Sequence, residues 1–216
     1  MSQLTFRNAT PADARQVASL LTASFANYPM YRTILNRFFK TNEAYYNYLN
    51  KLHYVQAMTN IRKGHCLVAE INGTIIATAV MQELGKTHFT LTDYLRSGAL
   101  PVLQYLRPTL HFLPFLEKSS LQAKTNAPAH SWYLESYVVH PQWQGQQIGS
   151  RFFHESIFPY ITQKGAQSLA LVTNTHDNCR FYTRHGFTQT HYHQIQNVDV
   201  WTFIAKFQQP PSRTNE

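Results

Sequence analysis

The chain has 216 residues, of which 44% are hydrophobic and 14% aromatic. This composition can build a packed core and excludes intrinsic disorder, collagen and coiled coil. The length predicts a single domain over residues 1–207, and the polar segment 208–216 is expected to be a disordered tail. The formal net charge of +8 favours an anionic partner, a role that nucleic acid, a membrane surface or a phosphorylated cofactor would fill equally well.

Cysteine content and hydropathy indicate the compartment. Cys66 and Cys179 are too few for a disulfide framework. The N-terminal segment lacks the apolar core of a signal peptide. The most apolar stretch, residues 99–116, is interrupted by prolines and by polar side chains such as Arg107, which makes it a poor membrane-spanning helix. We therefore expect a cytoplasmic protein with no membrane partner.

A strand and a helix are expected at the start of the chain. Leu4 and Phe6 alternate with polar neighbours, which is typical of a strand. Thr10 is a good helix N-cap, and the Pro11 that follows it suits a first helical turn, so a helix is expected over about 11–25. Residues 26–62, rich in Tyr, Phe and Asn, are expected to form one or two further helices.

Asn72-Gly73 is the strongest turn signal in the chain. Both central residues of a type I′ turn need positive φ, which asparagine and glycine adopt most readily. The apolar and β-branched runs on either side, 66–71 and 74–81, are therefore expected to pair as a hairpin.

The Leu- and Pro-rich segment 85–130 is expected to be a helical insertion between strands 3 and 4. Its helical pieces are predicted near 90–97 and 101–118. Two roles remain open for the insertion: packing on the core or on a second subunit, or forming a lid over an acceptor pocket.

The pattern becomes more regular after Trp132. Helices interleaved with strands, followed by a terminal strand pair, predict a mixed α/β (α+β) domain. Pro159 lies inside an expected helix and is predicted to kink that helix or end it early. The expected elements are a strand over 133–139, a helix over 147–164, a strand over 168–173, a helix over 176–184, and strands over 187–193 and 198–207.

A polar turn containing glycine follows the strand that ends at Pro141. A turn that directs backbone N–H groups toward a helix start is an anion site, because the unpaired donors and the helix dipole both favour phosphate. Gly145 would let the backbone approach a ligand closely, and Gly149 would do the same where the helix meets the ligand. An ordinary strand–turn–helix connection is the alternative.

A second motif runs from Asn178 to Phe187. Asn178 and Tyr182 lie four residues apart, so they share one face of a helix. Gly186 fits the end of that helix. Taken alone, the aromatic residues of this motif are equally well explained as core side chains.

Together the two motifs resemble the GNAT N-acetyltransferase superfamily. Gln144-Gly145-Gln146-Gln147-Ile148-Gly149 is similar to the family's Gln/Arg-x-x-Gly-x-Gly/Ala turn, which holds the pyrophosphate of acetyl-CoA, except that Gln147 replaces the middle glycine. Asn178-x-x-Phe-Tyr182-x-x-x-Gly-Phe187 is similar to a second family pattern. The resemblance, which covers about 131–187, implies a GNAT fold: a central twisted mixed sheet, flanked by helices, that splays apart near Val138–His140 to admit acetyl-CoA.

The resemblance also implies the roles of individual residues. Tyr182 would protonate the departing CoA thiolate, which a phenol with a pKa of about 10 can do at neutral pH. Asn178 would hydrogen-bond the pantetheine arm or the acyl region, while backbone groups of Val138 and Val139 would bind the acetyl carbonyl and the pantetheine amides. The residues expected to bind the cosubstrate acetyl-CoA are Tyr137, Val138, Val139, Gln144, Gly145, Gln146, Gln147, Ile148, Gly149, Ser150 and Asn178.

A general base is needed because an amine acceptor is mostly protonated at neutral pH. Glu135 is the expected base, on a strand face shared with Tyr133 and Tyr137. A surface carboxylate or an acceptor-binding group are the alternatives for Glu135, and His140 is the reserve candidate for the base.

Three further interpretations define the alternatives. Two alternative functions are an acyl-CoA-binding module without activity and a basic nucleic-acid-binding domain, although the Lys and Arg residues of the chain are scattered. No metal site is expected, because His176 with Cys179 and His191 with His193 are only partial ligand sets. The leading prediction is an N-acetyltransferase acting on a small-molecule or peptide amine by direct attack in a ternary complex, without nucleic acid, as a monomer or homodimer.

Overall fold

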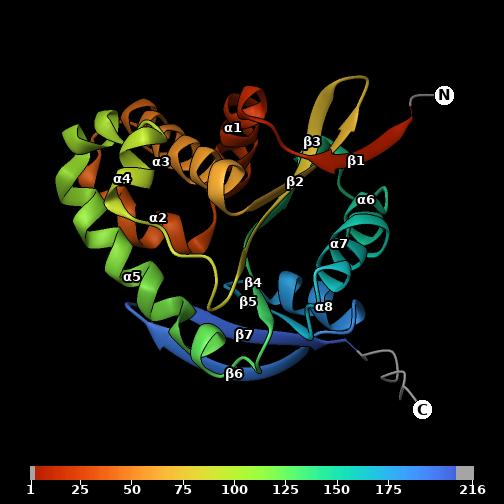
Figure 1. Ribbon diagram of the computed structural model, residues 1–216. Coiled ribbons are helices and arrows are strands. Elements are labelled where there is room, and N and C mark those ends of the chain that lie inside the picture. The colour runs from red at the N-terminus through yellow and green to blue at the C-terminus, as the bar shows by residue number, and fades with distance from the viewer. Residues whose placement is uncertain (1–2, 208–216) are drawn as a thin grey trace, which may run out of the picture.

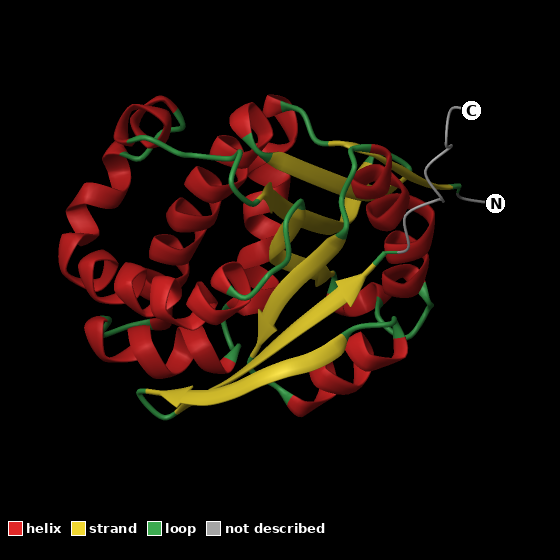
Figure 2. Cartoon of the chain, turned by 60° about the horizontal axis from the view of Figure 1, so that its bottom comes forward, coloured by secondary structure: helices red, strands yellow, loops and turns green. Residues whose placement is uncertain are grey.

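The computed structural model describes residues 3–207, so the expected tail at 208–216 lies outside the described residues. Seven strands form one sheet in the order β1-β2-β3-β4-β5-β7-β6. Neighbouring strands are antiparallel except β4 and β5, which are parallel. Helices cover both faces of this twisted sheet (Figure 2), which confirms the predicted mixed architecture.

The elements follow the predicted order. The strands are β1 (Leu4–Asn8), β2 (His65–Ile71), β3 (Thr74–Glu83), β4 (Ser131–Val139), β5 (Ser168–Thr173), β6 (Thr188–Ile195) and β7 (Val198–Lys206). The helices are α1 (Ala14–Phe25), α2 (Pro29–Leu35), α3 (Asn42–Lys63), α4 (Leu91–Arg96), α5 (Leu106–Thr125), α6 (Ile148–Arg151), α7 (Phe158–Gln163) and α8 (His176–Arg184). The predicted hairpin is confirmed: β2 pairs with β3, and Asn72 and Gly73 have φ values of 51° and 76°.

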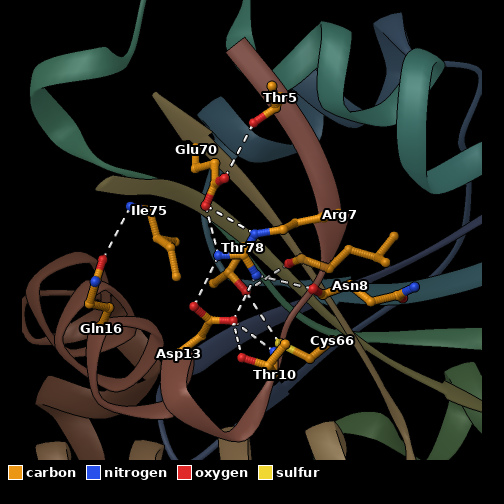
Figure 3. A network of polar contacts seen from close by, with 11 residues as sticks. Thr5, Arg7, Asn8, Thr10, Asp13, Gln16, Cys66, Glu70, Ile75 and Thr78 are labelled. Carbon is orange, nitrogen blue, oxygen red and sulfur yellow. Dashed lines mark hydrogen bonds and ion pairs between the residues drawn. The ribbon is translucent and has the colours of Figure 1, made fainter. Parts of the chain in front are cut away.

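Arg7 ties the first strand to the first helix and to β2 (Figure 3). Its Nη1 lies 2.7 Å from Asp13 Oδ2, and its Nη2 lies 2.7 Å from Glu70 Oε2. Thr10 is the N-cap, as predicted, and its backbone N–H donates to the carboxylate of Asp13, the third residue of the turn, at 2.7 Å from Oδ2. These hydrogen bonds, that of Arg7 above all, lower the pKa of Asp13 to about 2.

The helix after the polar turn accommodates Pro159 by a local change of hydrogen bonding. Residues Phe152–Ile157 form a π-helical turn between α6 and α7. The N–H of Phe158 donates to the carbonyl of Phe153, five residues back. A π-turn is a common way to absorb a break in the i→i−4 pattern, and proline, which lacks an N–H, imposes such a break. The predicted helix over 147–164 therefore continues to Gln163 through this irregularity.

Each face of the sheet has its own core. On one face, α6, α7 and α8 cover β2, β3, β4, β5 and β7 through a cluster that includes Trp132, Phe152, Phe153, Ile157 and Phe203. On the other face, α1 and α3 pack on β2 and β3 through Val17, Leu21, Ala57, Val68 and Val80.

The predicted helical insertion between β3 and β4 is confirmed, and it builds a third core. Helices α2, α3 and α5 enclose an aromatic cluster that contains Tyr31, Tyr45, Tyr48, Phe112 and Phe115. In Figure 1 these helices and α4 gather on one side of the molecule, away from α6, α7 and α8. Among residues 3–207, no helix is both long and apolar enough to span a membrane.

Candidate active site

The sheet opens between β4 and β5. The parallel ladder joins Ser131–Leu134 to Ser168–Leu171 and then stops. β4 continues to Val139 paired only with β3, while β5 continues to Thr173 paired only with β7. The edge of β4 beyond Leu134 is thereby left without a strand partner on the β5 side, next to the polar turn, where the carbonyl of Val139 accepts Gln144 Nε2 at 2.9 Å.

A β-bulge at Glu135 corrects one prediction. Val80 of β3 pairs with Ser136 and the next residue, Met81, pairs with Leu134, so Glu135 has no partner across the ladder. An extra residue reverses the alternation of side chains along a strand. Tyr133 therefore packs against Ala123 of α5, whereas Tyr137 packs against the core formed by α6, α7 and α8. The prediction that Tyr133, Glu135 and Tyr137 share one face is wrong.

The Glu135 carboxylate is held by amide side chains from two elements. Its Oε1 accepts from Gln56 Nε2 at 2.8 Å. Its Oε2 accepts from Gln82 Nε2 at 2.6 Å and from Asn60 Nδ2 at 3.5 Å. These donors from α3 and β3 fix the orientation of the carboxylate, and Glu135 with Gln56 and Gln82 lines a cavity. None of these amide residues carried a sequence signal, because they lie outside both motifs.

The polar turn presents a row of backbone donors. Gly145 and Gln147 have φ values of 78° and 59°, and α6 begins at Ile148. The N–H groups from Gly145 to Ser150 have no hydrogen-bond partner among the described residues, and the first to be paired is that of Arg151, bonded to the carbonyl of Gln147. Left-handed φ at Gln147 is the reason glycine is preferred at that position. The turn thus fits an anion, because its unpaired N–H groups lie at the N-terminus of α6.

Gly149 lines the cavity at the polar turn and also has a packing role that the sequence did not reveal. A Cβ atom at this position would lie 3.0 Å from Tyr137 Oη and 3.3 Å from Phe181 Cζ. Tyr137 Oη also donates to the carbonyl of Gly149 at 2.7 Å. Packing between β4, α6 and α8 thus favours glycine at this position, whether or not a ligand approaches it.

Helix α8 carries Asn178 and Tyr182 on one face, as predicted. The Thr175 hydroxyl caps the helix by accepting the N–H of Asn178 at 3.3 Å. Tyr182 is only 7% exposed and lies against Phe153, Phe187 and Phe203. Burial raises the pKa of Tyr182 above its ordinary value, so the phenol stays protonated at neutral pH.

Tyr28, just before α2, is a site residue that the sequence did not reveal. Its Oη accepts the backbone N–H of Asn174 at 2.8 Å and Asn178 Nδ2 at 3.2 Å. It also lies 2.9 Å from Thr173 Oγ1. Tyr28 therefore joins α2 to the end of β5 and to α8. It sits in the Tyr-rich segment 26–62, where no motif separated it from its aromatic neighbours.

Two cavities meet at these residues. The first, of about 550 Å³, is lined by the polar turn, by the end of β4 and by α8. The second, of about 680 Å³, lies under the insertion and is lined by Glu135, Glu117, Lys124 and several aromatic side chains. Five residues belong to the lining of both cavities: Phe25, Tyr28, Tyr137, Asn178 and Tyr182.

Most of the predicted cosubstrate residues line the smaller cavity. They are Tyr137, Val138, Val139, Gln144, Gly145, Gln147, Ile148, Gly149, Ser150 and Asn178. Gln146 lies outside that lining, and its side chain donates to the carbonyl of Gln142 at 3.2 Å. His140, the reserve base, lines neither cavity, and its Nδ1 accepts the N–H of Gln142 at 3.3 Å.

The remaining candidates are accounted for by packing. Burial raises the pKa of the half-buried Cys179 thiol, which disfavours its thiolate form. His191 and His193 lie next to each other with ring centroids 5.2 Å apart and ring planes tilted by 39°. Within residues 3–207 no group of three His, Cys, Asp or Glu residues is arranged to hold a metal ion.

Comparisons with known proteins agree with this geometry. The model of the acetyltransferase (GNAT) family matches residues 28–187. A polyamine N-acetyltransferase from Drosophila melanogaster, described as forming N-acetylagmatine, is 18% identical with a TM-score of 0.61, and the match covers 95% of this chain and 100% of that one. PaiA N-acetyltransferase from Thermoplasma acidophilum, solved with coenzyme A, is 11% identical with a TM-score of 0.58, covering 95% and 99%.

A third structure has a different partner bound. The C-terminal condensation domain of Ebony, solved with β-alanyl-dopamine, is 10% identical with a TM-score of 0.64, and the match covers 96% of this chain and 100% of that one. A search of curated proteins found no match. The family model spans most of the chain, including the polar turn and the Asn178–Phe187 motif, and the chain therefore belongs to the GNAT acetyltransferase family.

Proposed function

We propose that this protein transfers the acetyl group of acetyl-CoA to a primary amine of a small acceptor molecule. The observation that carries the proposal is the meeting of two cavities at Tyr28, Asn178 and Tyr182. The cavity at the polar turn suits the cosubstrate, because the unpaired N–H groups of Gly145 to Ser150 match a diphosphate. The cavity under the insertion suits the acceptor.

The smaller cavity also suits the extended arm of the cosubstrate. The end of β4 at Val138 and Val139 lines this cavity without a partner on β5, so its backbone can hydrogen-bond the pantetheine amides once the ligand displaces Gln144 Nε2 from the Val139 carbonyl. Asn178 is positioned by Tyr28 at the junction, where the thioester would lie. An N–H donor directed at the thioester carbonyl stabilises the negative charge that develops on its oxygen during attack.

The reaction proceeds by direct attack of the amine on the thioester carbon. The ammonium of the acceptor first loses a proton, which Glu135 accepts through water. The free amine then forms the N–C bond, and the C–S bond breaks. The departing thiolate takes the proton of Tyr182, whose hydroxyl is regenerated from solvent as the second amine proton leaves. The products are an amide, coenzyme A and one proton, and holding both reactants together supplies much of the rate.

The lining of the larger cavity favours a small cationic amine. Two carboxylates, Glu117 on α5 and Glu135 on β4, lie among aromatic walls that include Tyr31, Phe89 and Tyr94. Carboxylates attract the ammonium group, and aromatic faces bind both cations and aromatic bodies. The similar solved structures include a polyamine N-acetyltransferase and a domain bound to β-alanyl-dopamine. Such walls suit both kinds of amine, the polyamine and the dopamine derivative.

Thiol release from acetyl-CoA tests the proposal. The rate is measured with spermidine, agmatine, tyramine and dopamine, and the acetylated product is identified by mass spectrometry. Tyr182→Phe is expected to lower kcat by about a hundredfold, while acetyl-CoA binding in calorimetry is kept. Tyr192→Phe, a matched change at an exposed tyrosine of β6, should leave the rate unchanged. Equal rates for the two variants at saturating acceptor would reject the proton-donor role, and no heat with acetyl-CoA would reject the site.

A further inference from the structure

The insertion carries a large exposed apolar face. Among the eleven exposed large hydrophobic residues of the described chain, nine lie between Leu91 and Leu121. The five at its centre are Leu100, Leu103, Leu106, Leu110 and Leu113, whose exposed fractions range from 47% to 64%. Monomeric proteins rarely expose a contiguous apolar surface of this extent unless something binds it.

These leucines form one face of α5 and of the short turn before it. From Leu103 to Leu113 they recur at intervals of three and four residues, which places them side by side on a helix. The opposite face is already used, because Phe112 and Phe115 are buried against α2 and α3. In Figure 1, α5 forms the outer edge of the molecule on the side away from α6 and α7. The leucine face is therefore available to a partner.

Basic side chains border the leucine face. Arg107 and His111 lie on α5 next to Leu103, Leu106 and Leu110 in helical spacing, and Arg37 approaches from the turn after α2. Arg37 Nη2 contacts His111 Nε2. The Arg37 and Arg107 guanidinium carbons lie 5.1 and 5.8 Å from the centre of the Phe38 ring.

This basic border encloses a cavity of about 680 Å³ and contains no acid. The lining consists of Arg37, Phe38, Phe39, Gln104, Tyr105, Arg107, Pro108 and His111. Lys51 Nζ adds a further charge, 5.6 Å from the centre of the Tyr105 ring. None of the ion pairs found within residues 3–207 involves Arg37, Lys51 or Arg107. Cations gathered without a counter-charge are most stable next to an anion.

The distribution of charge argues against a second copy of the chain as the occupant. In a two-fold pairing of antiparallel α5 helices, each flank meets the same flank of the partner, so Arg107 and His111 would face their own copies. In a parallel pairing this border would meet the other flank of α5, which carries Thr109 and Lys124 and no carboxylate. Of the two carboxylates of the insertion, Asp93 pairs with Lys63, whereas Glu117 is exposed one turn beyond Leu113, borders the acceptor cavity and forms no ion pair within residues 3–207.

We propose that the insertion docks this protein on an anionic phospholipid membrane. The leucines from Leu100 to Leu113 enter the boundary between headgroups and acyl chains, and Arg37 and Arg107 contact headgroup phosphates. An apolar helix face with a basic border is the structure that binds in this way, lying in the plane of the interface without spanning it. The prediction of no membrane partner, which rested on the absence of a spanning segment, does not address such binding. The proposal goes beyond acetyl transfer and does not depend on it.

Vesicle flotation of the full-length protein tests the proposal. Vesicles of phosphatidylcholine alone are compared with vesicles containing phosphatidylglycerol, at low and at high salt. We expect binding to the anionic vesicles, little binding to the neutral ones, and weaker binding at high salt. Replacing Arg37 and Arg107 by Gln should lower the affinity roughly fivefold for each residue. Leu106→Ser with Leu110→Ser should lower it by roughly tenfold or more.

Matched controls separate the face from general effects. Lys206→Gln removes a charge at the end of β7, and Tyr192→Ser removes an exposed apolar side chain on β6, so both should bind as the wild type does. Circular dichroism verifies that each variant is folded. Equal binding of all variants, or no binding of the wild type to anionic vesicles, would overturn the proposal. So would a lipid-free dimer in sedimentation velocity that the leucine variant converts to monomer, because a second copy would then cover the face.

Discussion

Tyr28→Phe is the most informative single change, because it removes one oxygen and three contacts. The Asn174 backbone N–H loses its acceptor at 2.8 Å, and Asn174 is only 7% exposed, so water replaces that acceptor poorly. A buried donor left unpaired costs about 1–3 kcal/mol. The half-buried Asn178 amide, at 3.2 Å, adds about 0.5–1 kcal/mol. The free energy of unfolding should therefore fall by about 2–3 kcal/mol.

Urea unfolding measures the fall in the free energy of unfolding of Tyr28→Phe. An unchanged m-value would show that the folded and unfolded states are as compact as those of the wild type. Asn178→Ala removes only one of the contacts and should cost about 1 kcal/mol or less. Tyr192→Phe removes an exposed hydrogen bond to Asp199 Oδ1 at 2.8 Å and should cost still less. If Tyr28→Phe is no more destabilising than Tyr192→Phe, the junction does not depend on this hydroxyl and the reasoning fails.

Three further changes probe the structure around the site. Because the Arg7 guanidinium lowers the pKa of Asp13 to about 2, this carboxylate stabilises the fold above about pH 4, and the contribution is lost as the pH falls toward 2. Asp13→Asn should remove that part of the acid sensitivity, about 1–2 kcal/mol in unfolding titrations between these pH values. Gly149→Ala should lower the free energy of unfolding by about 1–3 kcal/mol even without ligand, because the added Cβ would crowd Tyr137. An unchanged thermal unfolding midpoint of the ligand-free protein would contradict this prediction. Gln147→Gly should change the free energy of unfolding by less than about 1 kcal/mol, because the relief of left-handed backbone strain is offset by the greater freedom of the unfolded chain. Gln147→Val, which cannot relieve that strain, should lower the free energy of unfolding by about 2 kcal/mol. Equal urea midpoints for the Gly and Val variants would argue against strain at this residue.

The sequence predicted best those elements whose signals are local. Asn72-Gly73 specifies its turn by the φ values it permits, so the hairpin and its position were predicted correctly. The helix face shared by Asn178 and Tyr182 likewise depends only on spacing. Both features are set by residues within one turn of each other.

Contacts between distant segments gave no such signal. Tyr28 reaches Asn178 across 150 positions of the sequence, and Gln56 reaches Glu135 across 79. No periodicity links such pairs, because each depends on how α2 and α3 are placed against the sheet. Gly149 illustrates the same limit: its motif position was recognised, but its contact with Phe181 follows from the packing of α8.

The bulge at Glu135 connects the wrong prediction to the chemistry of the site. Strict alternation would place Tyr133, Glu135 and Tyr137 on one face, and the carboxylate would then compete for space with the aromatic core. With one extra residue, Tyr137 stays in the core beside Gly149, while Glu135 faces Gln56 and Gln82 in the acceptor cavity. The same extra residue occurs where β4 leaves β5, since the ladder between them ends at Leu134. A single irregularity in β4 thus accounts both for the placement of the carboxylate and for the point at which the sheet opens, and neither can be read from the local sequence.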